Sequence, residues 1–310
     1  MESKKLIVTA SPHITNHTST RGLMLNVCIA LLPALVASTL IFGARALLVT
    51  GVTVAACVGF EALYCVVMKK PVPVGDFSAV VTGMILAFNL PATIPLWIAI
   101  IGAFVAIVVA KQLFGGLGFN FANPALLGRI VLFIGFAGRM TAYAFPQTDI
   151  DALASATPLV AGNSMAGKDM LLQLLLGAHG GVLGGTCAVA LILGGIYLIA
   201  TKTISAAIPL SYIGTVAVLS LVLGQDVVLQ LFSGGLLLGA FFMATDYVTR
   251  PFAFTGRIVY GVCLGVITCI IRFYGNMAEG VSFALLLMNL LVPYINDLTR
   301  QKPLGGAKAK

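Results

Sequence analysis

The chain has 310 residues, of which 59% are hydrophobic and only 9% are charged. Because soluble domains carry about 25% charged residues, this composition excludes a soluble globular protein and indicates an integral membrane protein. The formal net charge of +8 does not indicate a nucleic-acid-binding protein, since the basic residues are scattered at the ends of apolar stretches and form no patch.

The first 22 residues form a polar arm. The arm has no apolar core followed by a small-residue cleavage site, so we predict no signal peptide. His13 and His17 are spaced four residues apart, but two histidines without further ligands do not indicate a metal site. We expect the arm to pack on partner subunits.

A first group of apolar stretches follows, each long enough to suggest a membrane-spanning helix. We predict spans at 23–42, 46–68, 76–90, 94–113 and 124–138. The third and fifth are short, because Asn89-Leu90-Pro91 ends the third and Asn123-Pro124 opens the fifth. Such breaks occur at membrane depth only where protein or a cavity provides partners for the freed backbone groups.

A long polar interval, residues 139–182, comes next. It contains the stretch Asp151-Ala-Leu-Ala-Ser-Ala-Thr157-Pro-Leu159 and, after a turn-forming segment, the short apolar run Met170–Leu176. We expect a partly helical cap on the membrane surface. Thr157 precedes a proline, which by itself indicates a turn, and no neighbouring histidine or cysteine could activate its hydroxyl.

The second group of predicted spans covers 183–200, 205–223, 227–245, 256–274 and 281–298. The two groups are weakly alike: the stretch that begins at Lys111 resembles the one that begins at Arg272. We therefore predict an all-α membrane protein of about ten transmembrane helices in two inverted five-helix repeats, with a site where the repeats meet. The predicted parts are an N-terminal arm, a first repeat, an extracytoplasmic segment, a second repeat and a C-terminal tail, at 1–22, 23–138, 139–182, 183–298 and 299–310.

The basic residues predict the orientation of these spans. With ten spans, thirteen of the 18 lysines and arginines fall on the side of the N-terminus and four on the other side, while Arg129 lies within a span. The positive-inside rule then places both termini in the cytoplasm and the 139–182 segment, with Thr157, outside.

Acidic residues in or near the spans are candidates for an ion path. Glu61 lies well within the second span, and Asp76 and Asp246 lie near the cytoplasmic ends of the third and eighth. An unpaired charge at the membrane centre costs about 2.5–3.5 kcal/mol, which favours either a function or a partner. These acids can equally be caps of span ends or, for Glu61, one half of an ion pair. The six cysteines lie in apolar runs without metal-binding spacing, so we interpret them as apolar fillers.

Several short motifs, in their order and spacing, resemble those of one family of membrane proteins. The chain resembles the RnfD proteins of the Rnf complex, the ion-translocating ferredoxin:NAD oxidoreductase, and is also similar to the NqrB proteins of the sodium-pumping NADH:quinone reductase. The motifs that carry the resemblance are Ser11-Pro12-His13, Asp76-Phe-Ser-Ala, Asn89-Leu90-Pro91, Phe119-Asn-Phe-Ala-Asn-Pro-Ala125, Ser155-Ala-Thr-Pro-Leu159, Thr245-Asp246 and Ser282-Phe-Ala-Leu-Leu-Leu-Met-Asn289.

The resemblance implies that FMN is attached to Thr157 through a phosphoester bond, and that Asp151 and Ser155 belong to the attachment signal. Ala154 and Ser155 depart from the family, which commonly has Ser or Thr and then Gly there. A noncovalent riboflavin is a second implied cofactor.

Further residues are expected on the same side as Thr157 and are candidates for cofactor binding: Asn89, Arg139, Arg272, Glu279 and Ser282. Arg139 or Arg272 could neutralise phosphate charge. Alternatively, either arginine could simply extend its charge from a span end to water.

The function implied is electron transfer within a respiratory, ion-translocating complex of the prokaryotic cell membrane. The implied partners are the outward-facing flavoprotein RnfG, the membrane proteins RnfA and RnfE, the cytoplasmic protein RnfC and the lipid bilayer. The sequence has no nucleotide or Fe–S motif, so the chain alone should not oxidise NADH. The alternative is a urea-transporter-like channel or transporter without a redox role, because a fold does not fix a function.

Overall fold

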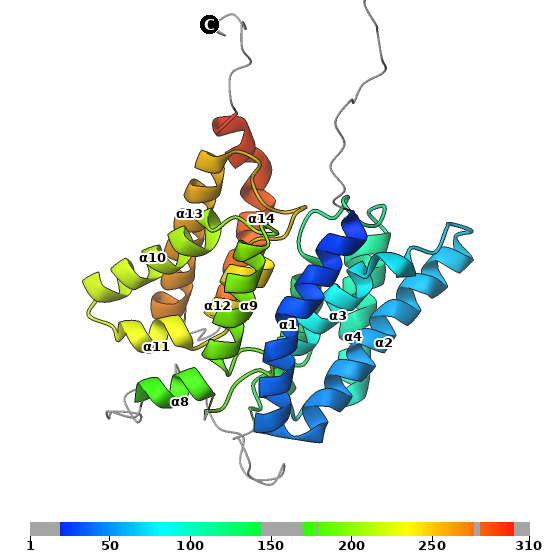
Figure 1. Ribbon diagram of the computed structural model, residues 1–310, viewed down its shortest axis with the longest axis horizontal. Helices are drawn as coiled ribbons and strands as arrows, with labels where there is room; N and C mark the ends of the chain where they lie inside the picture. The colour runs from blue at the N-terminus through cyan, green and yellow to red at the C-terminus, as the bar shows by residue number, and fades with distance from the viewer. Residues whose placement is uncertain (1–18, 144–169, 178, 276–279, 301–310) are drawn as a thin grey trace, which may run out of the picture.

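A computed structural model describes residues 19–143, 170–177, 179–275 and 280–300 of the chain. The described residues form helices joined by loops, and their one isolated β-bridge joins Pro91 to Val182. The helices form two groups that lie side by side (Figure 1). The predicted all-helical architecture is therefore confirmed for these residues.

The first group is built on two long helices, α1 (Thr20–Phe42) and α2 (Ala44–Val67). Ser19 caps α1, its Oγ accepting a hydrogen bond from the Gly22 amide at 3.1 Å. Gly43, with φ of 71°, makes the turn between the two helices. The shorter elements that follow are η1 (Val74–Asp76), α3 (Ser78–Phe88), α4 (Leu96–Phe104), the π-helix η2 (Val105–Gln112), α5 (Pro124–Gly135) and α6 (Ala137–Met140).

The second group follows the short helix α8 (Met170–Leu176), which is the apolar run predicted in the polar interval. Its elements are α9 (Ala188–Ala200), α10 (Ala207–Val222), α11 (Val227–Phe232), α12 (Leu236–Leu238), the π-helix η4 (Gly239–Met243), α13 (Phe254–Tyr274) and α14 (Val281–Leu298). The start of α1 and the end of α14 lie at the same end of the molecule, and α8 lies at the opposite end (Figure 1).

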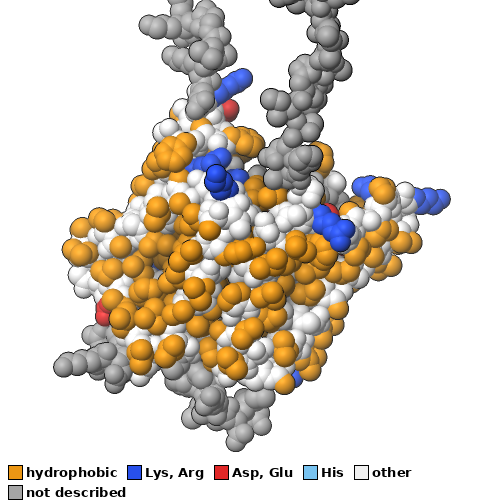
Figure 2. Space-filling view, in the orientation of Figure 1, with side chains coloured by type: hydrophobic (Ala, Val, Ile, Leu, Met, Phe, Trp, Pro, Cys, Tyr) orange, Lys and Arg blue, Asp and Glu red, His pale blue; other side chains and the backbone are white. Residues whose placement is uncertain are grey.

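Length and composition make this a multi-pass membrane protein. Within the described residues, the four helices α1, α2, α13 and α14 are long and apolar enough to cross a membrane, and five shorter apolar helices accompany them. Large apolar side chains on α1, such as Leu32, Val36 and Leu40, are 47%, 56% and 73% exposed. Figure 2 shows hydrophobic side chains over the middle of this face and most Lys and Arg toward the end where α1 begins. This distribution is expected for a surface in contact with lipid.

The prediction of a continuous span at 227–245 is wrong. That stretch is divided into α11, a bend at residues 233–235, α12 and η4. Gly234 and Gly235 have φ of 67° and 68°, a left-handed conformation that interrupts a helix and that glycine adopts readily. Apolar residues stand on both sides of the bend in the sequence, so the stretch is typical of one continuous span.

The break after α3 was predicted, and the structure shows which groups donate hydrogen bonds to the backbone carbonyls there. The chain from Asn89 to Pro95 is not α-helical. The loop before α9 donates to it, from Leu183 N to Leu90 O and from Gly184 N to Phe88 O, both at 2.9 Å. Protein from the second group therefore provides partners for a break in the first, as broken membrane helices require.

Candidate functional site

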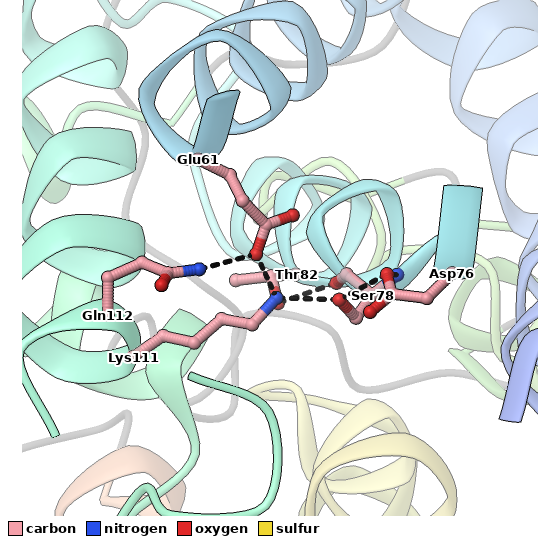
Figure 3. A network of polar contacts seen from close by, with 6 residues as sticks. All are labelled: Glu61, Asp76, Ser78, Thr82, Lys111 and Gln112. Carbon is pink, nitrogen blue, oxygen red and sulfur yellow. Dashed lines mark hydrogen bonds and ion pairs between the residues drawn. The ribbon is translucent and has the colours of Figure 1, made fainter. Parts of the chain in front are cut away.

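A buried ion pair lies inside the first group of helices. Lys111 Nζ in η2 donates to Glu61 Oε1 of α2 at 2.7 Å, and the two side chains are only 3% and 0% exposed. Gln112 Nε2 donates to the same carboxylate oxygen at 2.8 Å (Figure 3). Glu61 is therefore one half of an ion pair, which was one of its two predicted roles. Among the described residues, this is the one ion pair.

The polar contacts continue from the ion pair to the start of α3. Lys111 Nζ also donates to Ser78 Oγ at 2.6 Å, and Ser78 Oγ donates to Asp76 Oδ1 at 2.6 Å. The Asp76 carboxylate also accepts from the Ser78 amide at 2.8 Å, so it satisfies one of the free amides in the first turn of α3. Asp76 is partly exposed while Glu61 is fully buried. The network thus connects a partly exposed carboxylate to a buried one (Figure 3).

The two charges of the ion pair neutralise each other, but one carboxylate oxygen has no hydrogen-bond partner among the described residues. Glu61 Oε2 is buried and finds no hydrogen-bond partner among the described residues. Two buried charges are tolerated when they neutralise each other, whereas removing one partner leaves an uncompensated charge. The burial of Lys111 is therefore tolerated because Glu61 is present, and the burial of Glu61 because Lys111 is present.

A small cavity of about 70 Å³ lies beside this network. This volume is well below the roughly 300–1,000 Å³ of pockets that bind drug-sized ligands. Its wall combines residues from both helix groups, with Met24 and Ile85 from the first group facing Phe241 and Phe242 from the second. The polar residues in its wall are Ser78, Thr82, Lys111, Asn120, Asn123, Thr245 and Asp246.

Asn123 and Asp246, in the wall of the cavity, also accept local hydrogen bonds. Asn123 Oδ1 accepts from the amides of Ala125 at 3.1 Å and Leu126 at 3.4 Å, which caps α5 just before Pro124. Asp246 lies past the end of η4, where Thr249 Oγ1 donates to Oδ2 at 3.3 Å. Burial raises the pKa of the Asp246 carboxyl above its usual range, although nearby backbone amides oppose this effect.

A second polar contact joins the two helix groups. Arg129 of α5 is 4% exposed, and its Nη1 donates to Asn89 Oδ1 at 2.8 Å and to Ser282 Oγ at 2.7 Å. Asn89 ends α3 and Ser282 lies in the first turn of α14. The structure thus brings together two residues predicted for the site, through an arginine that sequence reasoning placed in a span without assigning it to the site.

The other predicted arginines lie apart from this contact. Arg272 Nη1 donates to Gln230 O at 2.7 Å, and Nη2 donates to Ser233 O at 3.1 Å and Gly234 O at 3.4 Å. Arg272 therefore holds the end of α11 and the following bend. Arg139 is exposed in α6.

Several predicted site residues lie outside the described residues, namely Thr157, Ser155, Asp151 and Glu279, together with His13 and His17. Within the described part of the chain, no group of three or more His, Cys, Asp or Glu side chains could hold a metal ion.

Lys111 and Gln112 were missed in the sequence-based prediction of the site. The available signal was that Lys111 falls inside the predicted span 94–113, where a lysine needs a partner. Sequence reasoning instead counted this lysine among the residues of the cytoplasmic side.

Comparison with known proteins gives matches over nearly the whole chain. The model of the NQR2, RnfD, RnfE family matches residues 7–305. The D subunit of the Na(+)-translocating ferredoxin:NAD(+) oxidoreductase complex of Acetobacterium woodii is 44% identical, over 100% of this chain and 98% of the relative.

Two further relatives are also similar to this chain over nearly their whole length. The D subunit of the proton-translocating ferredoxin:NAD(+) oxidoreductase complex of Clostridium ljungdahlii is 38% identical, over 96% of each chain. The D subunit of the ion-translocating oxidoreductase complex of Stutzerimonas stutzeri is 37% identical, over 93% of each chain. The names of the first two relatives give different coupling ions, so the similarity does not select the ion.

Proposed function

Because the chain belongs to the NQR2, RnfD, RnfE family, we propose that it is the electron-carrying membrane subunit of an ion-translocating ferredoxin:NAD oxidoreductase complex. The observation that carries this proposal is the 44% identity to the D subunit of such a complex over the full length of the chain. Family membership also confirms the resemblance found from the sequence motifs.

The proposed electron carrier is FMN bound covalently to Thr157 through a phosphoester bond. The support is the stretch Asp151–Leu159, which lies between the two helix groups in the sequence. A threonine in this role is an anchor and takes no part in the redox chemistry, because the phosphoester leaves the flavin ring untouched. Arg139, exposed in α6, is the described arginine nearest in sequence to this stretch and is a candidate to neutralise the phosphate.

A second, noncovalent flavin is proposed to lie between the helix groups at the cavity beside Lys111, whose walls would have to move apart to admit it. The side-chain amides and hydroxyls of the cavity, such as Asn120 and Thr82, suit the polar edge of a flavin ring and a polyol chain, and Phe241 and Phe242 provide apolar walls. The cation of Lys111 is already neutralised by Glu61. This charge balance favours a ligand without a phosphate, such as riboflavin, over FMN.

The same cavity supports a proposed ion path. Asp246, Ser78 and Lys111 all line it, and the network behind Lys111 includes Glu61 and Asp76. Of the three acids named from the sequence, Asp246 lines the cavity, and Glu61 and Asp76 are hydrogen-bonded to Lys111 and Ser78 in its wall. An ion that enters there would exchange its hydration shell for carboxylate, hydroxyl and amide oxygens.

The proposed architecture is ten membrane spans in two inverted repeats, related to that of urea transporters. The proposed orientation puts both termini in the cytoplasm and Thr157 outside. In the complex, we expect contacts with the outward-facing flavoprotein RnfG, the membrane proteins RnfA and RnfE and the cytoplasmic protein RnfC. What supports this arrangement is the division of the described helices into two groups and the positions of the ends of α1 and α14 (Figure 1).

Flavin fluorescence tests the proposal directly. The full chain would be produced with its attaching enzyme and a full flavin supply, denatured and examined in a gel under ultraviolet light. We expect a fluorescent band for the wild type and a dark band for Thr157→Ala. A colourless wild type under these conditions would contradict the electron-carrier role, and uptake of a small neutral solute by the isolated chain would instead support a transporter.

A further inference from the structure

An open groove lies where α13 begins and α14 ends. Its walls are Phe252, Ala253 and Phe254 on one side and Asn296, Asp297 and Arg300 on the other, around a volume of about 490 Å³. Both helices are among the four that are long enough to cross a membrane. The groove therefore lies at a boundary between membrane and water, separate from the cavity beside Lys111.

The groove is held in shape by hydrogen bonds that fix its loop. Arg257 donates from Nε to Pro251 O at 3.2 Å and from Nη2 to Phe252 O at 3.0 Å. The Phe252 amide donates to Asn296 Oδ1 at 3.1 Å, which joins the loop to α14. A Cβ on Gly256 would lie 2.7 Å from Thr299 Oγ1, so the two helix ends are also closely packed. The groove is thus preformed.

The rim of the groove is unusually apolar for residues that face outward. Phe252 is 77% exposed, Phe254 is 63% exposed and Leu298 of α14 is 85% exposed. Tyr294, one helical turn before Leu298, is 69% exposed. Aromatic side chains in such positions are typical of the headgroup level of a membrane, where an apolar rim contacts glycerol and the upper acyl chains.

Positive charge is concentrated around this rim. Arg300 lines the groove, Arg257 holds its wall, and Arg250 lies in the loop that leads to α13, stacked over Tyr247 with its Cζ 4.6 Å from the ring centroid. Burial, together with the positive charge of Arg257, lowers the pKa of the Arg250 guanidinium. Within the described residues, none of the three arginines forms an ion pair, and the bonds of Arg257 go to uncharged carbonyls.

One acid also lines the groove. Asp297 offsets one of the three positive charges and Asp246, which attracts the Arg250 guanidinium, offsets a second, so one remains. The adjoining N-terminus of α13 adds to this positive character, since it has neither a capping side chain nor an acidic residue in its first turn. The groove is therefore complementary to an anion that carries apolar groups.

We propose that this groove binds the headgroup of an anionic phospholipid, with Arg300 on the phosphate and Phe252 and Phe254 against the glycerol and upper acyl chains. The apolar rim selects a lipid over free phosphate. The excess of arginine over Asp246 and Asp297 selects an anionic headgroup over a zwitterionic one.

Native mass spectrometry of the full chain in detergent, titrated with phosphatidylglycerol or phosphatidylethanolamine, tests this proposal. We expect one phosphatidylglycerol to bind about tenfold more tightly than phosphatidylethanolamine, the difference that one charge-assisted contact can give. Arg300→Gln should remove this preference, and Arg300→Lys should retain most of it. Inorganic phosphate should not displace the lipid; displacement by it at concentrations comparable to the lipid would identify a plain phosphate site and overturn the proposal.

Two further variants control for surface charge and for folding. Lys69→Gln removes an exposed cation from the loop after α2, at a distance from the groove, and should leave the preference unchanged. Asp297→Asn should strengthen phosphatidylglycerol binding, and its effect does not depend on whether the Arg300 variants fold. Equal binding of the two lipids by the wild type, an effect of Lys69→Gln as large as that of Arg300→Gln, or weaker binding by Asp297→Asn would each overturn the proposal.

Discussion

The two helix groups each hold a basic side chain near the end of a helix, fully buried for Lys111 and partly buried for Arg272, and they stabilise it differently. Lys111, in the last turn of η2, faces the carboxylate of Glu61 at 2.7 Å. Arg272, in the last turn of α13, faces the carbonyl oxygens of Gln230 and Ser233 at 2.7 and 3.1 Å. The two residues begin the stretches that resemble each other in the sequence.

The two basic residues therefore occupy similar stretches of sequence but are stabilised by different chemistry. In the first group a full negative charge cancels the lysine, and the pair can stay buried beside the cavity. In the second group the arginine charge is spread over backbone dipoles, and its planar guanidinium bridges several acceptors around a bend. The first arrangement depends on charge balance, whereas the second depends on hydrogen-bond geometry.

The largest effect is expected from breaking the charge balance. Lys111→Met leaves Glu61 buried and unpaired, and should lower the free energy of unfolding by about 3–5 kcal/mol. Denaturant titration of the purified chain in mixed micelles measures this loss. The double variant Glu61→Gln, Lys111→Met should recover more than half of it. A double variant no more stable than Lys111→Met alone would show that the pair is not held by charge.

A smaller loss is expected in the second group. Arg272→Met removes the donors that hold the bend after α11, and should cost about 3 kcal/mol, since several carbonyls lose a charged partner. Arg272→Lys should restore only part of this stability, because a single ammonium cannot bridge Gln230 and Gly234 as the guanidinium does. Full restoration by lysine would mean that charge, and not geometry, matters in both groups.

The packing between the two groups gives a third test. A Cβ on Gly194 of α9 would contact the Ala30 carbonyl of α1, so Gly194→Ala should push these helices apart and cost about 2 kcal/mol. Gly214 of α10 is a matched control, since nothing lies within 4 Å of its Cβ position. Thermal unfolding of both variants in one detergent checks the difference. Equal effects of the two substitutions would argue against close packing of α1 on α9.

The smallest effect is expected at the polar contact between the groups. Ser282→Ala removes one hydrogen bond of Arg129 and leaves the one to Asn89, so the loss should be about 1 kcal/mol. Ser220→Ala is the control, because the buried Ser220 hydroxyl has no hydrogen-bond partner among the described residues. That substitution should be neutral or slightly stabilising. The same unfolding assay compares the two, and a larger loss for Ser220→Ala would contradict the role given to Ser282.

Much of the fold could be predicted because apolar stretches of helical length are evident in the sequence. The break after Asn89 was also predictable, since Pro91 cannot continue a helix. The bend at residues 233–235 was not, because its two glycines lie between apolar residues that read as a continuous span. The pairing of Glu61 with Lys111 was suggested only as a general possibility, because residues 50 positions apart meet through tertiary packing.

Part of the candidate cofactor site could likewise be predicted from the sequence, and part could not. The cavity wall required the structure, since it combines Ser78 and Lys111 with Asp246 from the other helix group. Asn89 and Ser282 were named from the sequence, but the arginine that joins them was recognised only as a charge within a span. For Thr157, residue chemistry alone predicts a turn, and its role as a flavin anchor is a proposal that rests on the resemblance to the family.

Mass spectrometry of the peptide that contains Thr157 tests the central claim most directly. The chain would be purified from cells that contain the attaching enzyme and digested under conditions that preserve phosphoesters. The account predicts that the peptide carries the added mass of FMN, that fragmentation locates it on Thr157, and that Thr157→Ala yields only the unmodified peptide. A wild-type peptide that is entirely unmodified, from cells in which the enzyme flavinylates another substrate, would contradict it.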